Sequence, residues 1–382
     1  NEKCMKQLAV FARNFAGIHL DNKEFATAYP YAKIAYEESK TAFLLNRTYN
    51  TADLYSWNAT NMMRCMKRDS DSRKRFYEEA HQALDWMDQQ YVFPRTDESR
   101  RYLYVLEAEG EKALEMREKA LEVSRRLHER FPESGYEEWP LYDCRKYKDV
   151  LFAKAEHTRF DKILAALSEI EVRAKQLHEK TKDDYFLDFL HEWALDMTQI
   201  YSCQELFEEA ESYLQQAEVY LKCEYIQKAR FRWFREVITA IKGIVLYYTK
   251  GDKQKTQHYM QMAETLFADE EERNKNKTRK NHAIVWGARI KHMKARMLWE
   301  ETHDIAKTRA MVDTYFEAYT GVVDEKEQKP MRLLLGELEA AAGDEDQAYV
   351  EWKTVWTGAA SRSIWDRSQI TEYEVWQDVL AA

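Results

Sequence analysis

The chain has 382 residues but only ten glycines and five prolines, far below the usual shares of about 7% and 5%. Because tight turns depend on these two residues, the composition argues against sandwiches, propellers, parallel-sheet α/β folds and TIM barrels. The net charge is −9 and both signs alternate along the chain. This disfavours a nucleic acid as a general partner, since such binding needs a basic surface.

Other bulk features restrict the function only slightly. The longest uncharged apolar-rich run, Gly243 to Thr249, is far shorter than the roughly 20 residues of a membrane span. The five cysteines are scattered without a zinc-binding spacing. We therefore expect no membrane span in this chain and no cofactor or metal. The compartment stays open, because a signal or anchor could precede Asn1; the cytoplasm is slightly favoured. The oligomeric state also stays open.

Apolar residues recur at helical spacing along nearly the whole chain and predict about sixteen helical segments. A kink or a helix start is expected at Pro30, and a bend near Gly110. In chain order the predicted segments cover about 3–18, 22–45, 51–67, 71–91, 99–131, 141–157, 160–180, 182–201, 205–222, 225–250, 253–269, 279–301, 304–320, 324–342, 345–357 and 362–380.

The connections between these segments are short and have a clear turn chemistry. In Lys250-Gly251-Asp252 and Ala342-Gly343-Asp344, Gly suits the left-handed end of one helix and Asp caps the start of the next. Sixteen helices joined in this way predict about eight antiparallel hairpins, which would stack into an all-α superhelix.

Three stretches of the C-terminal half share residue types at matching positions. The matches are Tyr201, Ala210 and Ala217 in Ala194–Ala217; Tyr247, Gly251, Asp252 and Ala263, with Thr256 where Ala is usual, in Lys242–Phe267; and Leu335, Gly336, Gly343, Asp344, Ala348 and Trp352 in Met331–Val355. Alanines seven residues apart lie on one helix face, where small side chains let two helices approach closely.

This pattern resembles the tetratricopeptide-repeat (TPR) family over residues of about 190–360. The resemblance implies a TPR-like solenoid, although the aligned units begin about 46, 52 and 40 residues apart rather than 34. We expect residues 1–180 to hold helical hairpins with degenerate repeats and residues 181–382 to hold the TPR-like repeats, within one continuous solenoid. An irregular helical bundle is the alternative.

A helical superhelix offers the first helix of each hairpin to a protein or peptide ligand. We therefore predict a non-catalytic scaffold, or a sensor or regulatory arm. A cluster of Arg and Trp, residues that favour acidic groups and interface hot spots, begins one of these helices. The predicted partner-binding residues are Glu192, Gln199, Arg230, Arg232, Trp233, Arg235, Ile241 and Tyr248.

Two other classes of function stay open. An all-α enzyme could resemble a terpene synthase through Asp183, Asp184 and Asp188, or a helical-toroid glycosidase through its many carboxylates and aromatic residues. The Glu-x-x-His spacing of di-iron bundles occurs at Glu78–His81 and Glu300–His303. A nucleic-acid-associated regulator would use the basic residues of 228–235 and 273–280. No phosphate-binding loop or nucleophile motif is present.

Overall fold

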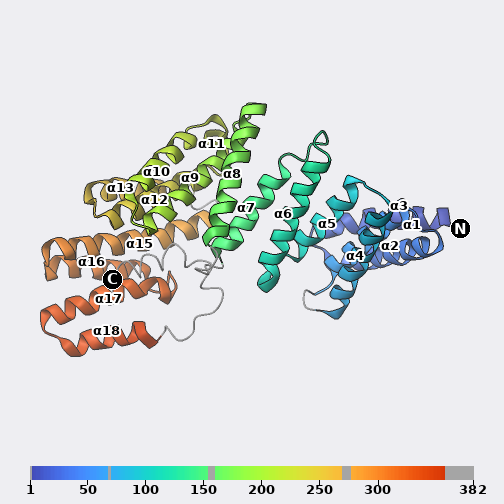
Figure 1. Ribbon diagram of the computed structural model, residues 1–382. Helices are drawn as coiled ribbons and strands as arrows, with labels where there is room; N and C mark the ends of the chain where they lie inside the picture. The colour runs from blue at the N-terminus through green and yellow to red at the C-terminus, as the bar shows by residue number, and fades with distance from the viewer. Residues whose placement is uncertain (1, 68–69, 154–159, 269–276, 358–382) are drawn as a thin grey trace. The chain divides into compact units, whose positions relative to one another are not determined.

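The computed structural model describes residues 2–67, 70–153, 160–268 and 277–357. These ranges contain 17 α-helices, one 3-10 helix and no strand, which confirms the all-α prediction (Figure 1). The chain divides into two compact units, one of Asn1–Leu151 with Asp161–Glu169 and the other of Phe152–Phe160 with Ile170–Ala382. Each unit is described by itself below, and the predicted division at residues 180 and 181 stays a prediction.

The first unit is built from hairpins of consecutive helices. Its elements are α1 (Glu2–Asp21), α2 (Phe25–Leu45), α3 (Tyr49–Cys65), α4 (Asp71–Gln90), α5 (Pro94–Glu107), the 3-10 helix η1 (Gly110–Lys112), α6 (Ala113–Arg130) and α7 (Trp139–Ala153). Helix α1 packs on α2, α3 on α4, and α5 on α6. Helix α8 (Phe160–Thr181) contributes residues to both units.

The second unit repeats the hairpin arrangement. Its remaining elements are α9 (Tyr185–Cys203), α10 (Phe207–Leu221), α11 (Glu224–Lys228), α12 (Arg232–Lys250), α13 (Lys253–Phe267), α15 (Lys277–Thr302), α16 (Ile305–Tyr319), α17 (Glu325–Ala342) and α18 (Glu345–Thr357). The hairpins are α9–α10, α12–α13, α15–α16 and α17–α18, and each contacts the next (Figure 1). This stacking of antiparallel hairpins is that of a TPR-like helical solenoid.

Some predicted boundaries were wrong. The stretch 99–131, in which a bend near Gly110 was expected, is two helices, because Gly110 takes a φ of 59° and the chain leaves the helix between α5 and α6. The stretch 225–250 is also divided, since Ala229 is extended between α11 and α12. Helix α2 begins five residues before Pro30 and continues through it. The predicted helix 362–380 lies outside the described residues.

Every hairpin of the second unit turns through one residue with left-handed backbone. These residues are Glu205, Gly251, His303 and Gly343, with φ between 49° and 88°. They are 46, 52 and 40 residues apart, which confirms the intervals predicted from the sequence. The same turn joins α1 to α2 in the first unit, where Lys23 has a φ of 62°. The hairpin register is therefore set by this turn and does not depend on Gly being present.

An aspartate after the turn caps the next helix in three of the four hairpins. The carboxylates of Asp252, Asp304 and Asp344 each accept a backbone N–H three residues later, at 3.0 Å. Such a cap satisfies one of the N–H groups that a helix start leaves without a partner. The predicted role of the Gly-Asp pairs is confirmed.

Small residues sit where the two helices of a hairpin touch. Ala210, Ala217, Ala263 and Ala348 are fully buried. A methyl group added to Gly336 would lie 2.3 Å from the indole of Trp352, so the α17–α18 contact requires glycine there. Gly243 is equally close to the ring of Tyr259 in α12–α13. These contacts give the repeat pattern its physical reason.

Candidate partner-binding surface

Most of the predicted binding residues lie on the first helices of the four hairpins, which are α9, α12, α15 and α17. Ion pairs join α9 to α12 and α15 to α17. The guanidinium of Arg235 on α12 donates to both carboxylate oxygens of Asp188 on α9, at 2.6 and 2.7 Å. It also lies 3.3 Å from Glu192. Because the side chain of Asp188 is 5% exposed and that of Arg235 13%, this is a largely desolvated, bidentate pair.

A second set of polar contacts continues along the same helix pair. The ammonium of Lys242, a buried residue, donates to the amide oxygen of Gln199. Thr239 donates its hydroxyl proton to the carbonyl of Arg235, so the 2.9 Å contact between Thr239 and His191 has Nε2–H of the imidazole as donor. Burial, with a smaller effect of Arg235, lowers the pKa of His191 to about 3. The imidazole is therefore neutral at pH 7.

Helices α15 and α17 are joined by the same kind of contact. Arg289 binds both carboxylate oxygens of Glu327, at 2.9 and 3.0 Å, and Arg296 donates to Glu337 at 2.6 Å. The paired residues are separated by 38 and 41 positions, compared with 47 for Asp188 and Arg235. Ion pairing between successive first helices thus recurs at roughly the repeat interval, and it fixes their side chains.

The predicted Arg and Trp cluster is split by the structure. Trp233 is buried and donates its indole N–H to the carbonyl of Leu266 at 3.0 Å. Arg235 already binds carboxylates of α9. Arg230 and Arg232 are exposed, and Arg232 contacts Glu236 of its own helix at 2.7 Å. Of the cluster, only these two arginines point toward solvent.

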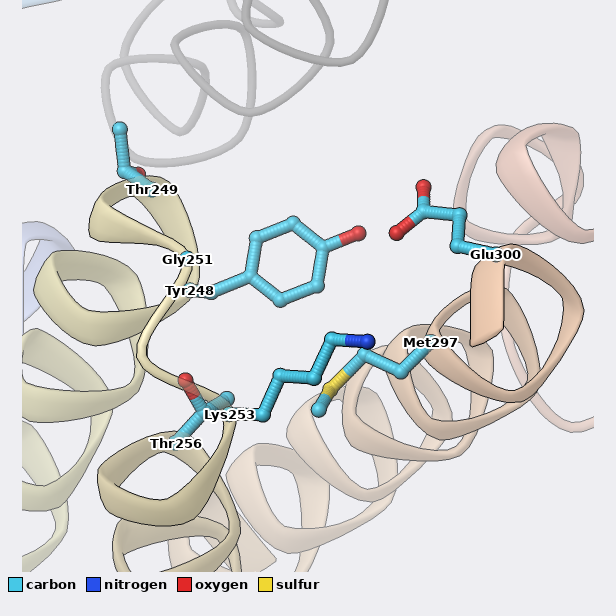
Figure 2. A pocket seen from close by; sticks show the side chains of 7 residues that line it. All are labelled: Tyr248, Thr249, Gly251, Lys253, Thr256, Met297 and Glu300. Atoms are coloured by element: carbon cyan, nitrogen blue, oxygen red, sulfur yellow. The ribbon is translucent and has the colours of Figure 1, made fainter. Parts of the chain in front are cut away.

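The other predicted residues also differ in exposure. Ile241 is 3% exposed and belongs to the core. Glu192, Gln199 and Tyr248 are half-buried. Tyr248 lines a pocket with Thr249, Gly251, Lys253, Thr256, Met297 and Glu300 (Figure 2). Its partner-binding role stays a prediction, as does that of the remaining residues.

Sequence reasoning missed the residues of α15 that complete this surface. Arg289 and Arg296 were not singled out, because each looks like one more charge on a solvated helix face. Glu300 was considered only for its Glu-x-x-His spacing with His303. The basic stretch 273–280 was considered for the nucleic-acid alternative. Within its described part, α15 begins at Lys277, and Arg279 is buried and donates to the carbonyl of Arg230 at 2.6 Å.

Several residues of the alternative functions have structural roles. Asp183 accepts the backbone N–H of Tyr185, and Asp188 binds Arg235. His81 contacts Arg100 at 3.2 Å, and His303 forms a hairpin turn. Within the described ranges, no three His, Cys, Asp or Glu side chains gather in a way that could hold a metal ion. Among the helices described, none is long and apolar enough for a membrane span.

Comparison with known proteins adds little. No family profile and no curated protein matches the sequence. Among solved structures, the chain aligns with a circular tandem repeat protein of novel repeat topology at 12% identity and a TM-score of 0.31, over 100% of this chain and 97% of that one. It aligns with yeast Tom70 at 11% identity and a TM-score of 0.29, over 98% and 95%. Such TM-scores carry no argument, so the fold assignment depends on the hairpin turns and packing described above.

Proposed function

We propose that the protein is a non-catalytic scaffold, or a sensor or regulatory arm, that binds a protein or peptide through the first helices of the hairpins in its second unit. The observation that carries this proposal is the pocket lined by Tyr248, which opens beside a surface whose charged side chains are held by inter-helix ion pairs. A surface with fixed side chains loses less entropy on binding than a mobile one.

The composition of this surface supports a peptide ligand. Exposed Arg230 and Arg232, half-buried Glu192 and Gln199, and the ring of Tyr248 provide hydrogen-bond donors, acceptors and an aromatic anchor. Stacked helical hairpins commonly use such an extended face for peptides and helices. The exposed arginines would receive acidic groups of the ligand.

A charge-reversal pair tests the location of the binding surface. The full chain is immobilised and offered a random peptide library, and the affinities of selected peptides are then measured by calorimetry. We expect Arg232→Glu to weaken binding at least about tenfold, which corresponds to about 1.4 kcal/mol. The control is Lys307→Glu on α16, the second helix of its hairpin, which changes the charge equally at a 73% exposed side chain.

Each substitution turns one local ion pair, with Glu236 or Asp304, into a like-charge pair. Such a pair costs only about 0.2–0.5 kcal/mol, so the fold should survive both changes. If Lys307→Glu weakens binding as much as Arg232→Glu, the surface is wrongly placed. If the library yields no peptide that binds, the proposed function itself is wrong.

A further inference from the structure

The volume of the pocket beside Tyr248 limits the size of the group that it can hold. It has a volume of about 240 Å³ and is lined by the end of α12, the turn at Gly251, the start of α13 and the last turns of α15. Pockets for whole drug-sized molecules usually measure about 300–1,000 Å³. This pocket is therefore suited to one side chain or a comparably small group.

Three polar groups point toward the open space of the pocket. Figure 2 shows the hydroxyl of Tyr248 and the carboxylate of Glu300 directed toward each other, with the ammonium of Lys253 beneath them and the thioether of Met297 alongside. Burial, with the nearby charge of Glu300, raises the pKa of Tyr248. The phenol stays protonated, and the uncharged ring forms part of the pocket wall.

The charges around the pocket do not cancel. Lys253 lies 3.0 Å from Glu301. Arg296 is shared by two carboxylates, since it contacts Glu300 at 2.9 Å and Glu337 at 2.5 Å. In the lining, Lys253 and Glu300 balance each other. With their ion-pair partners Glu301, Arg296 and Glu337, the network has two positive and three negative groups and a net charge of −1. An arriving cation would restore one counter-ion to each carboxylate, whereas an anion would have to displace Glu301 from Lys253.

The uncharged walls suit the same ligand. A cation over a tyrosine ring is attracted by the ring quadrupole, by about 0.5–2 kcal/mol depending on desolvation. Met297 offers an adaptable apolar contact for a methylene chain. Excess negative charge, an aromatic ring and an apolar wall together fit the charged head and aliphatic stem of one amino-acid side chain.

We propose that this pocket receives a lysine or arginine side chain of the bound peptide, with Glu300 as counter-ion and Tyr248 as the ring beneath the cation. The proposal rests on the proposed function and names the part of the ligand that this pocket recognises. The exposed arginines at the start of α12 would take acidic groups of the same peptide.

The test uses small probes and the full chain labelled with ¹³C at its methionine methyl groups. The Met297 signal is assigned with Met297→Leu, and Nα-acetyl-arginine amide, Nα-acetyl-norleucine amide and Nα-acetyl-glutamate amide are titrated at matched ionic strength. We expect a saturable shift of the Met297 signal with the arginine probe only. Glu300→Gln should weaken this binding about fivefold, the effect of one charge at about 4 Å in water.

Two further variants separate a charge effect from a change in fold. Glu317→Gln removes an exposed carboxylate of α16 and should leave the affinity unchanged. Lys253→Met removes the competing positive charge and should tighten binding of the arginine probe about threefold, which a merely damaged pocket would not do.

The proposal is overturned if the arginine probe gives no saturable shift, if the glutamate probe binds instead, or if Lys253→Met weakens binding of the arginine probe. None of these results affects the peptide-library experiment. A library that yields binders sensitive to Arg232→Glu, together with a silent pocket, would leave the proposed function standing and remove only this assignment.

Discussion

The two units build similar helical hairpins but join them differently. Within the described residues of the second unit, all four hairpins turn through one left-handed residue. In the first unit Lys23 makes this turn between α1 and α2, whereas the left-handed Gly110 leads from α5 into the 3-10 helix η1 before α6 begins. The repeat is therefore visible in the sequence only where the turn recurs. Hairpin packing by itself leaves a much weaker signal.

The surfaces of the two units differ as well. Helix α1 exposes Leu8, Phe11, Phe15 and Ile18 at helical spacing, and Phe11 is 64% exposed. The helices α9 and α12 instead bury charged groups against each other. In the first unit, the half-buried Glu79 accepts hydrogen bonds from Tyr55 at 2.6 Å and Lys40 at 3.1 Å. The buried Asp97 and Asp143 pair with Arg126 and Arg101, respectively, elsewhere in the unit. A stripe of apolar residues at helical spacing therefore does not show whether that face of the helix is buried.

The largest effect should come from the ion pair that joins α9 to α12. Arg235→Met leaves Asp188 without its bidentate partner, and breaking a buried pair in this way costs about 3 kcal/mol of unfolding free energy. Arg232→Met removes only an exposed contact within α12 and should cost less than about 0.5 kcal/mol. Urea unfolding measures the difference, and hydrogen exchange should show it in α9 and α12. Equal stability of the two variants would contradict the structural role of Arg235.

Replacing one glycine by alanine in each unit should change the stability in opposite directions. Gly336→Ala places a methyl group against the indole of Trp352 and should cost about 2 kcal/mol. Gly17→Ala on α1 meets no atom within 4 Å and should stabilise its helix by up to about 1 kcal/mol. Thermal unfolding of both variants is the measurement. Destabilisation by Gly17→Ala would show that the face of α1 is covered after all.

The buried histidines of the second unit predict a dependence on pH. Burial, with the nearby guanidinium of Arg235 or Arg296, lowers the pKa of His191 to about 3 and that of His292 to about 4. Below pH 6.5 the unfolded chain binds protons that the folded chain does not, so stability falls as the pH falls toward these values. From pH 7 to 5.5, each histidine should cost about 1 kcal/mol.

His191→Gln isolates this effect, because glutamine has the hydrogen-bonding groups to replace the Thr239 contact but does not titrate. The variant should lose about 1 kcal/mol less than the unaltered chain between pH 7 and 5.5. Urea unfolding at several pH values compares the two. An identical pH dependence would mean that His191 titrates alike in the folded and unfolded chains.

The smallest effect concerns the turn that the two units share. Lys23→Gly relieves a side chain at a φ of 62° and should stabilise the first unit by about 0.5 kcal/mol after the added entropy of the unfolded chain. Gly251→Ala introduces the same strain in the second unit and should cost about 1 kcal/mol. Unfolding midpoints in urea report both. A loss of stability in Lys23→Gly would mean that the lysine side chain contributes more than its backbone strain costs.

The sequence by itself determined the helices, the all-α class and the hairpin register of the second unit. Apolar periodicity, the pairs Gly251-Asp252 and Gly343-Asp344, and the buried alanines are local features, and local spacing fixes their structural role. The break between α11 and α12 was not predicted, because the carbonyl of Arg230 is bound by Arg279, which belongs to the next hairpin.

Only the tertiary structure decided how the charged residues of the candidate surface are used. In the sequence, Arg235 and Lys242 look like any solvated charge on an amphipathic helix. In the structure, each donates a hydrogen bond to a side chain far along the chain, 47 residues away for Arg235 and 43 for Lys242. Tyr248 and Glu300 come together from α12 and α15 to form a pocket. Pairing and pocket formation depend on which helix packs beside another, and the period of a single helix carries no information about its neighbour.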